Sequence, residues 1–172
     1  MSNIRLFFEK SLSLNLNTTL DKSMQAFNID KAMRNELLDL YRILSPYPEV
    51  KETLENLKEK KYKLAILSNG TPSLLNELVK SNNLQNLFDD IFSIEEVKIY
   101  KPSSKVYDMP IKKYNIKKEE AAFLSANTWD VSGGGNYGFS SVWVNRNNNI
   151  FDNLDYTPKN EISGLNQLLD IL

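Results

Sequence analysis

Polar side chains that could act on a small substrate occur in three clusters, each placed where a predicted strand ends. They are Ser68 with Asn69, Lys101 with Tyr107, and Ser125, Asn127 and Asp130 within the run FLSANTWD. Ligands of open α/β sheets bind outside the carboxyl ends of the strands, so the three clusters could meet at one site. The first cluster also precedes a predicted helix N-terminus, which favours binding of an anion.

The chain contains no Cys and no His, and these two absences exclude several catalytic chemistries. Without Cys there are no disulfides, thiolate nucleophiles or cysteine zinc sites. Without His there is no Ser-His-Asp triad, no H-E-x-x-H metal site and no histidine general base. Any chemistry must therefore come from carboxylates, Lys, Tyr, Ser, Asn and Arg.

Each cluster taken alone also has a purely structural interpretation. Ser-Asn-Gly is a favourable turn sequence, and a Lys before a Pro is usually a solvated loop charge. Tyr107 could be ordinary half-buried packing, and Asp130 could cap the turn into the glycine-rich segment that follows it. The order and spacing of the three clusters, more than any one of them, favour a functional site.

The element that positions Ser68 and Asn69 is the segment YKLAILSNGTP at residues 62–72. Its apolar run predicts a buried strand, which Ser68, Asn69 and Gly70 end in a turn. Thr71 is a suitable N-cap and Pro72 a suitable first residue for a helix over 72–83. This strand, turn and helix would place the first cluster at an edge of the sheet.

The remaining elements alternate between strands and helices. Strands are predicted within 88–93 and at 122–125 and 141–144, and helices at 48–60, 104–114 and 161–172, with a loop and a glycine-rich helical turn at 127–137. This alternation predicts an α/β fold of parallel β-α units with right-handed crossovers. Residues 1–45 are predicted to be all-helical and the rigid stretch Ser45-Pro46-Tyr47-Pro48 to end them, giving a helical subdomain at 1–45 and an α/β core at 46–172.

Composition limits the partners of the chain. At 172 residues with a net charge of −1, it has no basic excess that would indicate nucleic acid or an anionic membrane surface. No apolar run approaches membrane-spanning length, and the N-terminus carries no signal-peptide pattern. We therefore expect a cytoplasmic protein.

Four segments together resemble the type II L-2-haloacid dehalogenases of the haloacid dehalogenase (HAD) superfamily. They are SNGTP, VKIYKP with Tyr107 behind it, FLSANTWD, and YGFSSVWVNR, with LSPYPEV marking the return from a helical cap to the core. The resemblance implies a Rossmann-like HAD core with a parallel sheet and a remnant of a helical cap. It also implies hydrolysis of a small 2-halocarboxylic acid, in which an aspartate displaces the halide and water then cleaves the resulting ester.

The resemblance implies a role for each candidate residue. Ser68 and Asn69 would bind the substrate carboxylate, with Tyr107 and Trp129 lining the site. Lys101 would pair with the nucleophilic aspartate, Ser125 and Asn127 would hold that aspartate, and Asp130 would help to activate water. Phosphatases of the superfamily keep paired acidic residues near the last motif to hold Mg²⁺. Here Asn127 precedes Asp130, which favours the branch without a metal or another cofactor.

The sequence also departs from the family. It has no D-x-x-G-T motif, so the resemblance predicts a truncated core sheet that lacks the first, nucleophile-bearing strand. Its loss would leave two interior strand edges unpaired or force them to close up with altered geometry. Pro110 and the run Gly133–Gly135 would weaken their helices. We therefore expect a chain that is inactive alone, with a homodimer or a complementing N-terminal segment as the partners left open. Two alternatives remain: a Mg²⁺-dependent phosphatase-like hydrolase when complemented, and a non-catalytic binding or interaction domain.

Overall fold

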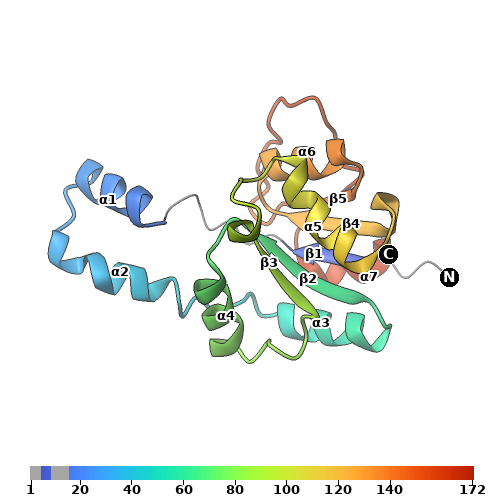
Figure 1. Cartoon of the computed structure of the whole chain (residues 1–172), viewed down its shortest axis with the longest axis horizontal. Coiled ribbons are helices and arrows are strands. Elements are labelled where there is room, and N and C mark those ends of the chain that lie inside the picture. Colours follow the sequence, from blue (N-terminus) through green and yellow to red (C-terminus); the bar gives the residue numbers. More distant parts are fainter. Residues whose placement is uncertain (1–4, 9–15) are drawn as a thin grey trace.

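The computed structural model of the chain describes residues 5–8 and 16–172 (Figure 1), with side chains described from Leu20 onward. Its helices are α1 (Leu16–Ala26), α2 (Arg34–Leu40), α3 (Val50–Glu59), α4 (Pro72–Ser81), α5 (Ser104–Tyr114), α6 (Thr128–Tyr137) and α7 (Leu168–Ile171). Its strands are β1 (Arg5–Phe8), β2 (Lys63–Ser68), β3 (Asp90–Ser93), β4 (Ala121–Ser125), β5 (Ser140–Val144) and β6 (Asn160–Ile162). Short 3₁₀ turns are η1 (Lys31–Met33), η2 (Ile94–Glu96), η3 (Lys118–Glu120) and η4 (Leu165–Gln167).

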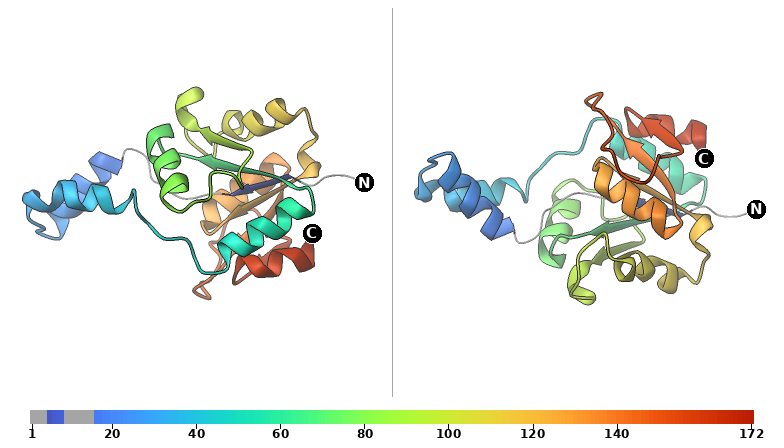
Figure 2. Two further views of the ribbon diagram at one scale, coloured as in Figure 1. Left: turned by 90° about the horizontal axis from the view of Figure 1, so that it is seen from below. Right: turned by 90° about the horizontal axis from the view of Figure 1, so that it is seen from above.

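The strands form one parallel sheet in the order β3-β2-β1-β4-β5-β6. Helices lie on both sides of it (Figure 2), which confirms the predicted α/β, Rossmann-like class. On one face, α3, α4 and α7 bury residues such as Leu57, Leu75 and Leu168. On the other face, Val106 of α5 and Phe123 of β4 belong to a second apolar cluster. Because both faces are covered, β2 and β4 are buried along almost their whole length.

The expected gap in the middle of the sheet is wrong, because β1 lies between β2 and β4. Phe8 is in register with Ile66 of β2 and with Leu124 of β4. The expectation of an all-helical segment over residues 1–45 is therefore wrong at residues 5–8. The run Arg-Leu-Phe-Phe is short and rich in residues that favour strands, and two open strand edges offer backbone partners on both sides.

Two helices project away from the sheet, as Figure 1 shows for α1 and α2. They are joined through η1, which Asp30 caps by accepting a hydrogen bond from the Ala32 amide at 2.9 Å. Arg34 Nε donates to Asp21 Oδ1 at 2.6 Å and links the two helices. The division of the chain at residue 45 stays a prediction. In the part of the chain that the structure describes, no helix is long and apolar enough to span a membrane.

The predicted helix at 161–172 is only partly correct. Its first residues form β6, which pairs with β5, and Ile162 O accepts a hydrogen bond from the Asn145 amide at 2.7 Å. The helical turns η4 and α7 begin only after Gly164. Gln167 Oε1 accepts hydrogen bonds from the Ser163 and Gly164 amides, which satisfies donors at the start of these turns.

Residues 128–137 form a complete helix, α6, in place of the predicted loop and single turn. Its glycines allow close packing. A Cβ at Gly134 would lie 2.5 Å from Phe123 Cδ1, and a Cβ at Gly133 would lie 2.7 Å from Pro102 Cβ. The interpretation of these glycines as weakening the helix is therefore incomplete, because they let α6 approach the sheet and the loop before α5.

Candidate active site

The loop after β2 brings the first cluster to the carboxyl end of the sheet. Ser68 Oγ accepts a hydrogen bond from the Gly70 amide at 3.0 Å, which tightens the turn. Thr71 then caps α4 through a hydrogen bond from the Leu74 amide, with Pro72 as the first helical residue. The predicted strand, turn and helix are therefore confirmed, and both Ser68 and Asn69 are buried.

Lys101 links this loop to the other two clusters. Its backbone amide donates to Asn69 Oδ1 at 3.1 Å. Its Nζ donates to the Leu67 carbonyl oxygen at 3.0 Å and to Asp130 Oδ2 at 3.1 Å. The side chains of Lys101 and Asp130 are both 0% exposed. The alternative of a solvated loop lysine is therefore wrong.

Asp130 lies in the first turn of α6, where a negative charge is stabilised by the helix dipole. Tyr107 OH donates to its Oδ1 at 2.9 Å, and the nearby Ser125 hydroxyl lowers the pKa of this carboxylate. Tyr107 is fully buried beneath α6, so its predicted half-buried packing is only part of its role. The carboxylate is thus held by two side chains, from the loop before α5 and from α5 itself.

Burial controls the protonation of this cluster. Loss of hydration raises the pKa of the Asp130 carboxyl, although Lys101 and the hydrogen bonds from Tyr107 and Ser125 act in the opposite direction. Burial lowers the pKa of Lys101 from 10.5 to about 8, against the attraction of Asp130. The pKa of Tyr107 is raised by its burial and by the adjacent carboxylate. Perturbed groups that lie together in this way are typical of functional sites.

The remaining candidate residues lie beside this cluster. Among the residues that the structure describes, their side chains form no hydrogen bonds with the cluster. Asn127 precedes α6 and contributes its backbone amide, which donates to Ser125 Oγ at 3.1 Å, while its side chain is half-buried. Trp129 is 36% exposed, on the first turn of α6. The structure thus brings together Asn69, Lys101, Tyr107, Ser125 and Asp130, with Ser68 in the adjoining turn.

Three groups beside this cluster were not predicted from the sequence. The Leu67 carbonyl accepts from Lys101, and the centroid of the Phe123 ring lies 5.5 Å from Lys101 Nζ. Ser93 Oγ donates to the Gly70 carbonyl at 2.7 Å and fixes the turn after β2. Ser93 ends β3, so the rule that polar residues at strand ends gather at one edge could have identified it.

The acidic residues of the described ranges, 5–8 and 16–172, do not form a cluster of three that could hold a metal ion. Asp130 is the carboxylate at the centre of the cluster, and its neighbours there are an amine, a phenol and a hydroxyl. Hard divalent cations take oxygen ligands, and charged carboxylates are the strongest of these in proteins. These residues do not fit a magnesium site.

Comparisons with known proteins agree with the resemblance. The chain is 34% identical over 144 residues to an (S)-2-haloacid dehalogenase of Pseudomonas sp. (strain YL), which covers 84% of this chain and 62% of that protein. It is 35% identical over 143 residues to (S)-2-haloacid dehalogenase 4A of Burkholderia cepacia, covering 83% of this chain and 62% of the relative. The chain therefore spans about three fifths of the length of these curated relatives.

Solved structures show the same fold. A crystal structure of a dehalogenase matches 90% of this chain and 70% of its own chain, with a TM-score of 0.86 and 31% identity. A structure of an L-2-haloacid dehalogenase matches 99% of both chains with a TM-score of 0.89, and its 22% identity shows the fold alone. The family model described as haloacid dehalogenase-like hydrolase matches residues 3–144. With most of its length matched, the chain belongs to the haloacid dehalogenase-like hydrolase family.

Proposed function

We propose that this chain carries the lysine and aspartate part of a hydrolytic site for small 2-haloacids, in which Lys101 and Asp130 act on a covalent ester. The observation that carries the proposal is the fully buried contact between Lys101 Nζ and Asp130 Oδ2, at 3.1 Å. The names of the curated relatives, (S)-2-haloacid dehalogenases, support this substrate class.

The proposed reaction has two steps. A carboxylate oxygen attacks C2 of the haloacid and forms a C–O bond, while the carbon–halogen bond breaks and the halide leaves with its electron pair. Water then attacks the carbonyl carbon of the ester. The acyl C–O bond breaks, which regenerates the carboxylate and releases a 2-hydroxy acid. Covalent catalysis of this kind needs no histidine.

Each residue of this chain has a defined part in the proposal. Lys101 keeps the attacking carboxylate ionised by its positive charge. Ser68 and Asn69, at the turn before α4, bind the substrate carboxylate. Asp130 accepts a proton of the attacking water, for which its raised pKa is suited. Tyr107 positions Asp130 through a hydrogen bond, and Ser125 lies close enough to lower the pKa of its carboxyl.

The sequence has no D-x-x-G-T motif, which is where the family carries the attacking aspartate. The chain therefore does not supply the attacking carboxylate in the form that the family uses. We therefore expect the 172-residue chain alone to release no halide. A segment from another polypeptide that carries a strand followed by this motif would complete the site if its strand displaces β1 from between β2 and β4. The functional unit is then a complex, and the partner is a complementing segment.

Chloride release from (S)-2-chloropropionate tests this proposal. The full chain is assayed alone and after co-expression with the N-terminal segment of the Pseudomonas sp. (strain YL) relative. We expect no chloride from the chain alone and chloride from the purified complex. Lys101→Met should abolish release by the complex, whereas Lys98→Met, at a loop lysine outside the cluster, should leave it unchanged. A stable complex that releases no chloride would contradict the proposal.

The same complex separates the two alternatives. Release of phosphate from a phosphate ester in the presence of Mg²⁺, without chloride release, would identify a phosphatase-like hydrolase. Saturable binding of propionate to the chain without turnover of either substrate would identify a non-catalytic binding domain. Both outcomes would replace the dehalogenase proposal.

A further inference from the structure

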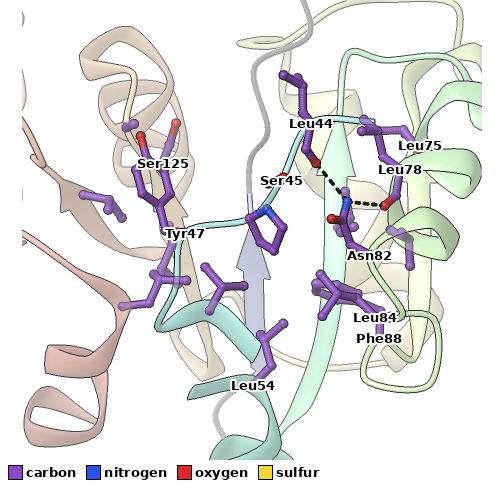
Figure 3. A pocket seen from close by; sticks show the side chains of 18 of the residues that line it. Leu44, Ser45, Tyr47, Leu54, Leu75, Leu78, Asn82, Leu84, Phe88 and Ser125 are labelled. Atoms are coloured by element: carbon purple, nitrogen blue, oxygen red, sulfur yellow. Dashed lines mark hydrogen bonds between the residues drawn. The ribbon is translucent and has the colours of Figure 1, made fainter. Parts of the chain in front are cut away.

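A cavity of about 260 Å³ lies on the face of the sheet opposite the buried lysine. Its walls come from α3, α4 and strands β2, β4 and β5, with the segment after α2 crossing its mouth (Figure 3). The residues that form its floor and sides include Leu54, Ile66, Leu75, Leu124 and Val144. All five are buried and apolar.

The size of this cavity matters because protein interiors are normally packed without large voids. An engineered apolar cavity of about 150 Å³ excludes water and binds benzene. The cavity here is larger and half-open to solvent, and its lining is mostly apolar, with Ser45, Asn82, Ser125 and Arg146 among its polar residues. Its walls are therefore suited to a hydrocarbon group of at least the size of an aromatic ring.

Polar groups at the mouth already bond to the protein itself. Asn82 Nδ2 donates to the carbonyl oxygens of Leu44 at 2.9 Å and Leu78 at 2.8 Å (Figure 3). Arg146 Nη2 donates to Glu49 Oε1 at 2.5 Å, so a carboxylate neutralises its charge. The Arg146 guanidinium also lies 3.7 Å from the centroid of the Tyr47 ring. The cavity thus favours a neutral ligand over an ionised one.

We propose that this cavity binds the hydrocarbon part of a small neutral molecule, either an alkyl chain or an aromatic ring. Burial of each methylene should strengthen binding about fourfold, from the transfer free energy of one CH₂ group. The strengthening should stop once the chain fills the cavity. The cavity adjoins the candidate active site, because Ser125 lines it, but neither Lys101 nor Asp130 belongs to its lining.

Binding of n-alkanols from propanol to decanol to the full chain tests the proposal by isothermal titration calorimetry. We expect one saturable site, with affinity rising about fourfold per methylene and then levelling off. Hexanoate should bind no more tightly than hexanol. Leu75→Phe should weaken hexanol binding at least tenfold. Leu74→Phe, on the adjacent residue of α4 that does not line the cavity, should leave it within about twofold.

A second measurement does not depend on whether the variants fold. NMR contacts between bound hexanol and the methyl groups of Ile66 and Val144 in the unmodified chain would place the ligand in the cavity. Non-saturable binding, no dependence on chain length, equal losses in the two variants, or tighter binding of hexanoate would each overturn the proposal. Dissociation of a dimer by hexanol, seen by sedimentation, would mean that a second copy occupies the cavity and would overturn it too.

Discussion

Lys101 Nζ lies 3.1 Å from Asp130 Oδ2, and the side chains of both residues are completely excluded from solvent. This contact joins the loop before α5 to the first turn of α6. Charges buried in this way remain tolerable only while each has its partner. The pair therefore contributes both to the stability of the fold and to the proposed chemistry.

Asp130→Asn tests the stability contribution of that link. The substitution removes the Asp130 carboxylate from its buried ion pair with Lys101, and we expect a loss of about 3–5 kcal/mol in unfolding free energy. Adding Lys101→Met should recover part of this loss, since the double variant removes both charges of the pair. Urea unfolding of the two single variants and the double variant measures the coupling. As a control, Glu77→Gln removes the exposed partner of Arg42 and should cost less than about 1 kcal/mol.

Tyr107→Phe should cost about 1.5–3 kcal/mol, because the hydroxyl is a buried donor to a carboxylate. The ring would stay packed against Phe123 and Phe139, whose centroids lie 5.6 and 5.8 Å away. Tyr114→Phe is a matched control, because its hydroxyl donates to Asp90 in a partly exposed setting. Urea unfolding should show a larger loss of unfolding free energy for Tyr107→Phe than for Tyr114→Phe. Equal losses would mean that the buried hydrogen bond contributes no more than the partly exposed one.

The lowered pKa of Lys101 predicts that the unfolding free energy rises at alkaline pH. Its pKa is about 8 in the folded chain, against 10.5 in an ordinary environment. Between about pH 8 and pH 10.5, Lys101 is protonated to a greater extent in the unfolded chain than in the folded chain. The contribution of Lys101 to the unfolding free energy therefore increases with pH in this range. NMR titration of the lysine Cε signals should show one midpoint near 8 that disappears in Lys101→Met. A Lys101 midpoint near 10.5 would contradict this prediction.

Much of the site follows from local signals in the sequence. The run at 62–72 has an apolar strand, a turn and a capped helix, each specified by neighbouring residues. Because strand ends share one edge of a parallel sheet, the positions of Ser68, Lys101 and Asp130 in the sequence are enough to place them near one another. The hydrogen bonds among them could not be predicted, because they depend on the packing of α5 and α6.

The errors arose where distant parts of the chain decide local structure. Residues 5–8 form a strand because β2 and β4 offer partners more than fifty residues away in the chain. Residues 160–162 likewise form a strand against β5. The glycines of α6 look unfavourable by helix propensity, and the close approach of the Phe123 ring and of Ser141 Oγ explains Gly134. Propensity is a weak guide wherever tertiary contacts compete with it.

Gly134→Ala should destabilise the chain although Ala is the better helix former. The new Cβ would lie 2.5 Å from Phe123 Cδ1 and 3.1 Å from Ser141 Oγ. We expect the overpacking cost of about 1–3 kcal/mol to exceed the gain in helix propensity. Asn136→Ala, at an exposed position of the same helix, should be neutral or slightly stabilising. Thermal unfolding of the two variants measures the difference, and a stabilised Gly134→Ala would show that α6 packs less closely.

The central position of β1 leads to the last prediction. Leu6 pairs with Leu64 on one side and with Ala122 on the other. Leu6→Pro removes a backbone donor from an interior strand, so we expect a loss of at least about 2 kcal/mol. Leu6→Val keeps the donor and a residue that favours strands, and should cost much less. Hydrogen exchange should show faster exchange in β2 and β4 for the Pro variant alone. If both variants unfold at the same urea concentration, β1 does not hold the two halves of the sheet together.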